Sequence, residues 1–380
     1  MTLTVEVAFD VQPGTEPAPG DWTDISSRVA GLGGTMVTVD RGANRGGTGD
    51  SSCRFKLDNY DRGMSPDTLS SEVLVRHCRL TYDSLPLFRG YTARWRDVWS
   101  FNEALIDVRL VDVFARLAQI DQDVDLPRQK SGARIDALLD LANIPAGLRD
   151  VDAGRVWLEA YEQTGANLRR SLEDVADAED GQLTVARDGT IQFRSRHDRL
   201  NATAAATLRG TGTASPGDLP VAEGLTPTRD TDELANVARV ELDDGTVHQA
   251  QDDLSIAEFG EWDLPVRDLA MPGYQAEALA NWIVTRYAWP NRWMDGVPVD
   301  LTDDTAGLTV GLGDLVEFVH AAPGGGSDSF EGHVERVRDD VDVGRLLSTW
   351  WLSPYFGAGP WFTVNDPVLG VVDAGNLIAP

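Results

Sequence analysis

The chain has 380 residues and a formal net charge of −28, because 61 acidic side chains outnumber 33 basic ones. At about 100 to 200 residues per domain, this length predicts two or three domains. The acidity argues against a protein that grips nucleic acid phosphates or an anionic membrane surface. An apolar share of 42% and a charged share of 25% are typical of a folded globular protein and argue against a wholly disordered chain.

The cysteine and lysine content bears on the compartment in which the chain is made. Cys53 and Cys78 are too few for a disulfide framework, and no spacing in the chain resembles a zinc site. Lys56 and Lys130 are the only lysines, so nearly all positive charge is arginine, a usage typical of a GC-rich genome. No run of about 18 apolar residues occurs, and the N-terminus alternates like a strand. We therefore expect a cytosolic origin, no membrane anchor and no classical secretion signal.

Residues 1–118 read as a β module. The expected strands are short, rich in Val, Thr, Phe and Trp, and separated by Gly, Asn, Asp and Ser. This spacing predicts an antiparallel sandwich or a small barrel. The expected strands are 2–9, 34–41, 52–57, 76–82, 87–95 and 104–111.

Residues 119–225 are expected to form an α/β insert that ends in a linker. The hydrophobic period becomes helical at 113–118, 134–141 and 166–179. A hairpin then follows, because the Arg187-Asp188-Gly189 turn separates the strands 183–186 and 190–194. The stretch 202–224 is rich in Thr, Ala, Gly and Pro and is the best linker candidate, although a weak strand can lie within it.

Residues 226–380 are expected to form a second β module with one helix and a C-terminal extension. Residues 236–242 and 247–251 form a hairpin, and residues 274–287 a helix. The remaining expected strands of this module are 297–301, 315–320, 332–338 and 348–352. The fold class is therefore mainly β with an α/β insert, in which two β-barrel-like or sandwich-like modules flank a helix-plus-hairpin domain.

The sequence lacks the familiar catalytic motifs. Neither lysine belongs to a P-loop, the Gly-rich stretch 42–49 reads as a mobile loop, and H-E-x-x-H and G-x-S-x-G are absent. His320 and His333 flank one loop, but ordinary strand residues are the favoured interpretation over a metal pair. The acids of residues 121–125 resemble the start of a calcium loop without its Gly and Glu, and a solvated loop is expected there. We assign no catalytic, cofactor-binding or metal-binding residue and expect no enzyme, although 61 acids do not exclude glycoside hydrolysis by themselves.

The chain contains eleven tryptophans. They can form a platform that stacks on carbohydrate, or they can anchor the core and subunit interfaces, as large aromatic side chains do. The second interpretation is favoured. Eight of them crowd strand ends and loops, namely Trp95, Trp99, Trp282, Trp289, Trp293, Trp350, Trp351 and Trp361.

Several motifs, taken in order, resemble the minor tail proteins of long-tailed, siphovirus-type bacteriophages, of the tail hub or baseplate hub type. The most specific motif covers residues 53–66, in which a strand leads to Leu57-Asp58-Asn59 and a turn ends at Ser65-Pro66. The resemblance covers most of the chain. Its other segments are 21–29, 39–42, 87–91, 180–181, 188–196, 282–287 with Pro290, 312–316, 332–337 and 349–354.

This resemblance implies a structural protein of the virion tail tip, made in the host bacterial cytoplasm. It implies a homo-oligomeric ring, expected to be a trimer, that joins the tail tube to the tip and guides DNA during ejection. The implied partners are the distal tail protein, the tape measure protein and other minor tail or fibre proteins. DNA would pass through an acidic channel without specific binding, because carboxylates repel phosphates.

Two alternatives stay open at this point. The chain could be a distal tail ring subunit or a peripheral fibre-attachment protein, or, less in keeping with the motifs, a carbohydrate-binding module directed at the cell wall. If the ring is right, we expect edge strands to pair between subunits. We also expect at least one of the loops 42–49 and 321–329 to become ordered only against a neighbouring subunit.

Overall fold

The computed structural model describes residues 2–31, 35–42, 51–69, 71–100, 103–210, 215, 217–222, 226–229, 231, 233–321 and 327–355. The loop 42–49 and the centre of the loop 321–329 lie outside these ranges, apart from Gly42 at the end of a strand, so the ordering expected there stays a prediction. Trp361 also lies outside them.

The N-terminal module is a β-barrel that closes on itself. Its pairings run in the order β4-β7-β6-β5-β1-β2, and Val29, which follows β2, bridges back to Leu57 of β4. In β4, Cys53, Phe55 and Leu57 are buried while the residues between them face solvent, the alternation that a strand with one buried face requires. The strands are β1 (Leu3–Ala8), β2 (Thr23–Asp24), β3 (Thr35–Gly42), β4 (Ser52–Asp58), β5 (His77–Tyr82), β6 (Leu85–Trp99) and β7 (Ala104–Val111).

A second barrel is built from strands of the C-terminal half. Its pairings run β16-β15-β22-β23-β24-β21, and Val221, just after β16, bridges Val299 of β21. The strands are β15 (Ala206–Arg209), β16 (Leu219–Pro220), β17 (Pro227–Thr228), β21 (Trp293–Asp300), β22 (Leu315–Ala321), β23 (Ser327–Asp342) and β24 (Arg345–Pro354). The described part of the linker candidate 202–224 contains the weak strand that was expected as an alternative, in the form of β15 and β16, and Leu208 and Leu219 are buried in this core.

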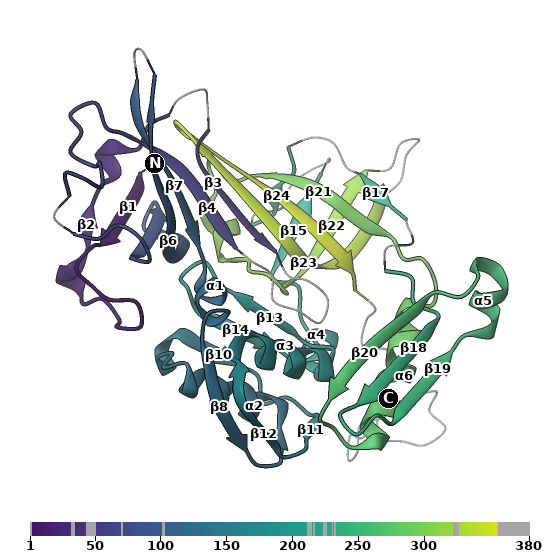
Figure 1. Ribbon diagram of the computed structural model, residues 1–380. Helices are drawn as coiled ribbons and strands as arrows, with labels where there is room; N and C mark the ends of the chain where they lie inside the picture. The colour runs from purple at the N-terminus through teal and green to yellow at the C-terminus, as the bar shows by residue number, and fades with distance from the viewer. Residues whose placement is uncertain are drawn as a thin grey trace.

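The two barrels share one sheet (Figure 1). Strand β3 pairs with β4 on one side and with the C-terminal half of β23 on the other, with Val37 opposite Val341 and Arg41 opposite Val337. A single hydrophobic core therefore runs from Val5 in β1 to Leu352 in β24. The edge strands that we expected to pair between subunits are largely used within the chain, because each barrel closes and β3 joins the two.

The insert packs around a second core and lies beneath the barrels in the view of Figure 1. Helix α3 begins after Asn167, whose side chain accepts a hydrogen bond from the Arg170 backbone N–H, and ends at Asp180. The 183–186 and 190–194 hairpin is confirmed as β13 and β14. The elements are α1 (Val113–Leu117), β8 (Asp121–Leu126), β9 (Gln129–Lys130), α2 (Ser131–Leu141), β10 (Arg149–Val151), β11 (Trp157–Leu158), β12 (Tyr161–Asn167), α3 (Leu168–Glu179), β13 (Gln182–Val185), β14 (Ile191–Arg194) and α4 (Arg196–Leu200).

The solvated loop predicted for residues 121–125 is wrong. These residues form β8, which pairs antiparallel with β12. Val124 is buried, whereas the three aspartates project outward as the exposed positions of a strand. The alternation of acids therefore reflects a half-buried strand and not a loop around an ion.

A third lobe combines a three-stranded sheet with two helices. Strand β18 lies between β19 and β20, and helix α6 packs on the sheet with Leu279, Ile283 and Tyr287 buried. Its core is continuous with that of the insert. The elements are β18 (Val237–Leu242), β19 (Val247–Gln251), α5 (Asp253–Phe259), β20 (Asp263–Leu269) and α6 (Gly273–Tyr287).

The predicted fold class, mainly β with an α/β insert and two barrel-like modules, is confirmed. The division into residues 1–118, 119–225 and 226–380 stays a prediction. The insert shares its hydrophobic core with α6 and β18. Limited proteolysis would test whether a domain boundary lies near residue 225.

A buried charge cluster fixes the insert to both barrels. The Asp339 carboxylate of β23 accepts hydrogen bonds from Arg41 of β3 at 3.0 Å and from Arg187, in the turn of the insert hairpin, at 3.1 Å. Ser348 donates to the same carboxylate at 2.6 Å. Burial alone would raise the pKa of Asp339, but Arg187 and then Arg41 hold it below its usual range. Burial, and then the neighbouring Arg187, lowers the pKa of Arg41 to about 9.

A second contact repeats this arrangement four residues earlier in β23. Glu335 accepts hydrogen bonds at 2.6 Å from Arg199 of α4 and from Ser353 of β24, and at 2.8 Å from the Gln182 amide of β13. Asp339 and Glu335 therefore hold the insert against β23, the strand that pairs with β3 where the two barrels join. Hydrogen bonds that involve charged groups are the strong ones, so these contacts set the angle of the insert.

We expect the Asp339→Asn substitution to lower the free energy of unfolding by about 3–5 kcal/mol, because it removes the anion that two buried guanidinium groups share. The Asp188→Asn substitution, in the exposed turn next to Arg187, keeps the acceptor for the Thr190 backbone N–H and serves as the control. Urea unfolding at pH 7 measures both. Equal stability of the two variants would contradict the assigned role of the cluster.

We expect a pH dependence from His333, which is 1% exposed and whose pKa is lowered to about 4 by burial and then by Arg199. The unfolded chain binds a proton near pH 6.5 and the folded chain only near pH 4, so the stability contribution is present above pH 6.5 and is lost as the pH falls to 4. The size is roughly 3 kcal/mol.

The variant His333→Asn, which keeps a donor for the Gly313 carbonyl, should remove this slope. The pKa of Asp177 is raised to about 7 by burial and then by Asp174, so this residue changes the stability with pH in the opposite direction. The quantity to compare is therefore the difference in the free energy of unfolding between variant and wild type at each pH. His248→Asn is the control, and unfolding curves at pH 7 and pH 5 provide the data. Parallel curves for wild type and His333→Asn would disprove the assignment.

Candidate assembly surface

The motif at residues 53–66 builds one end of the N-terminal barrel. Asn59 is fully buried, and its amide donates to Ser65 Oγ at 2.8 Å and to Asp97 of β6 at 3.2 Å. Its side-chain oxygen accepts the Met64 backbone N–H at 2.8 Å, and Trp95 donates to the Met64 carbonyl at 2.9 Å. The loop after β4 is thereby fixed on the β6–β7 hairpin.

One aromatic side chain on this loop and one at the end of β6 are exposed to solvent. Tyr60 is 81% exposed, and Trp99, at the end of β6, is 62% exposed. The Arg62 guanidinium lies 4.9 Å from the centre of the Trp99 ring, a cation–π contact. Arg28 and Asp61 form an ion pair at 2.7 Å beside them.

A second hairpin turn lies at the same end of the molecule. Val343, in the turn between β23 and β24, is 79% exposed, and Figure 1 shows this turn on the same side of the molecule as the last residues of β6 and the first residues of β7. The register agrees, because Val341 lies opposite Val37 and Val37 lies opposite Phe55, three residues before the end of β4. We call Tyr60, Arg62, Trp99 and Val343 the barrel-end surface. Large exposed aromatic and arginine side chains are typical of the energetic centres of protein interfaces.

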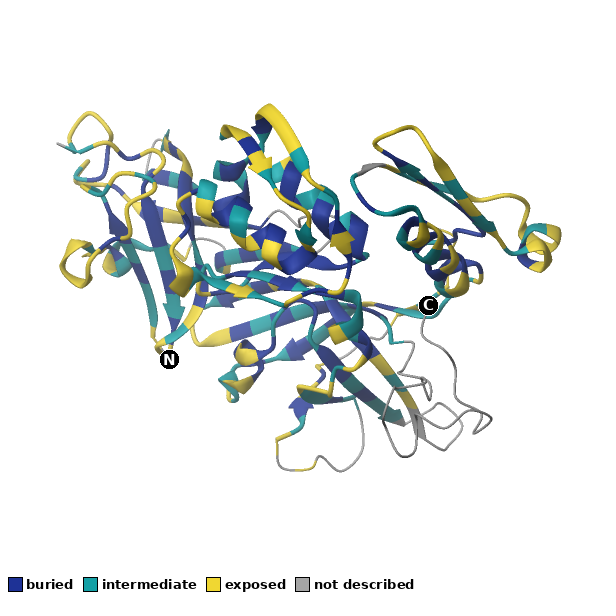
Figure 2. Cartoon of the chain, turned by 90° about the horizontal axis from the view of Figure 1, so that it is seen from below, coloured by how far each residue is buried: buried dark blue, intermediate teal, exposed yellow. Residues whose placement is uncertain are grey.

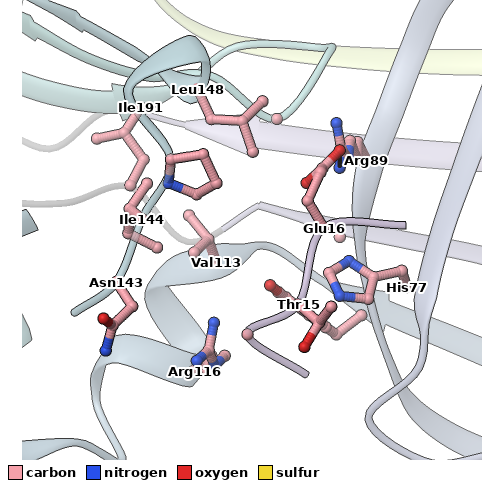
Figure 3. Close-up of a pocket in the computed structure, with 15 residues that line it drawn as sticks. Thr15, Glu16, His77, Arg89, Val113, Arg116, Asn143, Ile144, Leu148 and Ile191 are labelled. Carbon is pink, nitrogen blue, oxygen red and sulfur yellow. Dashed lines mark hydrogen bonds and ion pairs between the residues drawn. The ribbon is translucent and has the colours of Figure 1, made fainter. Parts of the chain in front are cut away.

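A pocket lies where the N-terminal barrel meets the insert (Figure 3). Glu16, His77 and Arg89 face Ile144, Leu148 and Ile191 across it. Arg89 donates to Glu16 at 2.6 Å, and burial, followed by Arg89, lowers the pKa of His77 to about 4, so the imidazole is neutral. The volume of about 40 Å³ holds a few water molecules and is far below the 300–1,000 Å³ of ordinary small-molecule sites. The pocket is a small gap in the joint between the N-terminal barrel and the insert.

The structure does not bring the two weighed histidines together. His333 lies opposite Leu315 and His320 opposite Asp328, so they sit at different ends of the β22–β23 pairing. Within the described ranges, no group of three or more His, Cys, Asp or Glu side chains is placed to hold a metal ion. In the same part of the chain, no helix is both long enough and apolar enough to cross a membrane.

The tryptophans divide between core and surface. Trp95, Trp282 and Trp350 are buried, as the core-anchoring interpretation predicts, whereas Trp99 and Trp289 are exposed. Sequence reasoning did not identify Tyr60 or Val343 as surface residues. In the sequence, the sign that each side chain is exposed is its place beside a turn residue. Tyr60 follows Asn59, and Val343 precedes Gly344.

No family model matches the sequence, and no curated protein is similar to it in sequence. Solved structures do resemble the fold. The 43 kDa tail protein of prophage MuSo2 from Shewanella oneidensis has a TM-score of 0.59 at 13% identity, over 92% of this chain and 98% of that one. A tail protein from Neisseria meningitidis has a TM-score of 0.60 at 13% identity, over 92% and 95%.

The Escherichia coli c3393 protein has a TM-score of 0.51 at 11% identity, over 84% of this chain and 73% of its own. It is described as a type VI secretion component with structural similarity to the T4 tail proteins gp27 and gp5. At these identities the likeness concerns the fold alone. The chain therefore has the fold of prophage tail proteins, and the resemblance in the sequence motifs is confirmed at this level.

Proposed function

We propose that the chain is a structural subunit of a bacteriophage tail tip, of the hub or baseplate type. In this role it forms a ring that connects the tail tube to the tip and guides DNA during ejection. The observation that carries the proposal is the pair of closed barrels joined through β3 and β23 in one chain, in a fold that solved prophage tail proteins share.

The paired barrels suit a symmetry adaptor. Three copies of a chain with two barrels offer six barrels around an axis, which suits contact with a six-fold tube on one side and a three-fold tip on the other. The rigid joint at Asp339 supports this role, since a ring that carries load needs its two barrels at a fixed angle. The proposed partners are the distal tail protein, the tape measure protein and other minor tail or fibre proteins.

The charge of the chain supports passage of DNA without capture. A net charge of −28 repels phosphates, so a lumen lined by part of this surface would let DNA slide. We propose a structural and not a catalytic role, a position at the tail tip of the virion, and synthesis in the host cytoplasm.

We expect a gold-labelled antibody against the chain to bind purified phage particles at the tip of the tail. Label along the tail tube, on peripheral fibres or on no particle would contradict the proposal. Retention of the free chain on host wall polysaccharide, lost in Trp289→Ala, would instead favour the carbohydrate-binding alternative.

We also expect the double substitution Tyr60→Ala and Trp99→Ala to shift the assembled chain toward monomers by at least tenfold in dissociation constant, because interface aromatics carry much of the binding energy. Both side chains are exposed, so the free energy of unfolding should change by less than about 0.5 kcal/mol. Tyr274→Ala, at an exposed position of α6, is the matched control. Analytical ultracentrifugation distinguishes the outcomes, and unchanged assembly would remove the barrel-end surface from the interface.

A further inference from the structure

Helix α5 lies at the outer end of the third lobe (Figure 1), a region that Figure 2 colours largely as exposed. Large apolar side chains are exposed on and after this helix and just after α6. Leu254 of α5 is 75% exposed and Trp289, after α6, is 47% exposed. Phe259 packs edge-on against Trp289 with ring centres 5.5 Å apart, and Trp262 donates to the Phe259 carbonyl at 3.1 Å. We call Leu254, Phe259, Trp262 and Trp289 the α5 platform. Three of its members, Phe259, Trp262 and Trp289, contact one another, and the platform belongs to neither barrel.

The platform is held rigidly from below by Asn236, which is fully buried. The Asn236 amide donates to the Gly260 carbonyl at 2.7 Å and to Ser255 Oγ at 3.1 Å, and its side-chain oxygen accepts the Trp262 backbone N–H at 2.7 Å. The Asn236 backbone carbonyl accepts the Asp252 N–H at 2.9 Å. Hydrogen bonds to Asn236 therefore fix both ends of the segment 252–262, which carries Phe259 and Trp262. Because this segment is already ordered, little conformational entropy is lost when a partner binds.

The rim of the platform is acidic. Residues 252–263 contain five carboxylates and no lysine or arginine. The Asp252 carboxylate accepts the Trp289 indole N–H at 3.1 Å, so one of these charges lies directly beside an aromatic ring. Arg239 pairs with Glu261 and Asp263, which leaves the rim with a net negative charge.

At two other places in the chain, an arginine side chain stacks on a tryptophan ring and pairs with a nearby carboxylate. Arg79 lies 4.2 Å from the centre of the Trp22 ring and pairs with Glu6 at 2.7 Å. Arg336 lies 4.6 Å from the Trp351 ring and pairs with Asp40 at 2.6 Å. Within the described part of the chain, no arginine stacks on Trp262 or Trp289.

We propose that the α5 platform docks a segment of another protein in which arginines alternate with apolar residues. The guanidinium groups would stack on Trp289 and Trp262 and pair with the acidic rim, while the apolar residues cover Leu254 and Phe259. The inference rests on the proposed function for its setting, a virion with several tail components in contact.

Charge argues against two other occupants. Residues 356–380 of this chain contain two aspartates and no basic residue, so they do not complement the rim. A two-fold contact between platforms of two copies would bring the same carboxylates face to face. A basic and apolar segment from a different protein fits the surface better than either.

The test uses the full-length chain and a short fluorescent peptide in which arginine alternates with leucine, followed by anisotropy. We expect binding to the wild type, about five- to tenfold weaker binding to Trp289→Ala, and a similar loss in Glu258→Lys, which alters only an exposed charge. The matched control Tyr274→Ala removes an exposed aromatic side chain of α6 that belongs to neither surface and should bind as the wild type does. Binding should also weaken as NaCl rises, because the charge pairs are exposed.

Several results would overturn the proposal. These are no binding, equal binding of a peptide in which glutamate alternates with leucine, unchanged affinity in Glu258→Lys, or self-association of the chain that Trp289→Ala abolishes. Circular dichroism melting confirms that each variant is folded. The peptide assay uses the free chain, so its result does not depend on where the protein lies in the virion. The peptide can fail to bind although antibody labelling places the protein at the tail tip, and it can bind although labelling does not. The two proposals are therefore tested separately.

Discussion

One buried carboxylate, Asp339, determines how the parts of the molecule are arranged. It lies on β23, the strand of the second barrel that pairs with β3, and it is shared by Arg41 of β3 and Arg187 of the insert. Two guanidinium groups in a dry interior are tolerable only with an anion between them, so their positions are fixed once Asp339 is in place. The Arg187 side chain also donates to the carbonyls of Leu308 and Val310, so the insert hairpin is tied to the loop before β22 as well.

This joint makes the two barrels and the insert one mechanical unit, on which the exposed features are then arranged. The barrel end carries Tyr60 on a loop fixed by Asn59, with Trp99 at the end of β6, and the third lobe carries Trp289 beside a segment fixed by Asn236. In both places a buried asparagine satisfies several backbone or side-chain groups and leaves an aromatic side chain in solvent. Rigid elements that present aromatic residues are what a multi-partner assembly protein requires.

The sequence predicted the local elements well, because alternation and turn residues are local signals. The hairpin around Asp188-Gly189 and the helix at 274–287 are present within a residue or two of their predicted bounds. It did not predict that β3 pairs with β23, since a contact between residues about 300 positions apart leaves no local pattern. Asp339 likewise lies in a charged run, Arg338-Asp339-Asp340, where only the pleat of the strand decides which acid is buried.

The candidate surface was predictable only in part. The motif at residues 53–66 carried the resemblance to tail proteins, but nothing in it showed that Asn59 is buried and organises the loop or that Tyr60 is exposed. Tryptophans next to each other, Trp350 and Trp351, differ in burial because successive strand residues face opposite sides. Composition alone could not sort the eleven tryptophans between core and surface.

The central claim is that a chain with two joined barrels builds a ring at the tail tip. The copy number of the chain in purified tails, measured by electron microscopy of the tip or by native mass spectrometry of the assembly, tests it most directly. The account predicts three copies arranged around the tail axis. Six copies in a ring, or a chain that stays monomeric beside its tail partners, would contradict it.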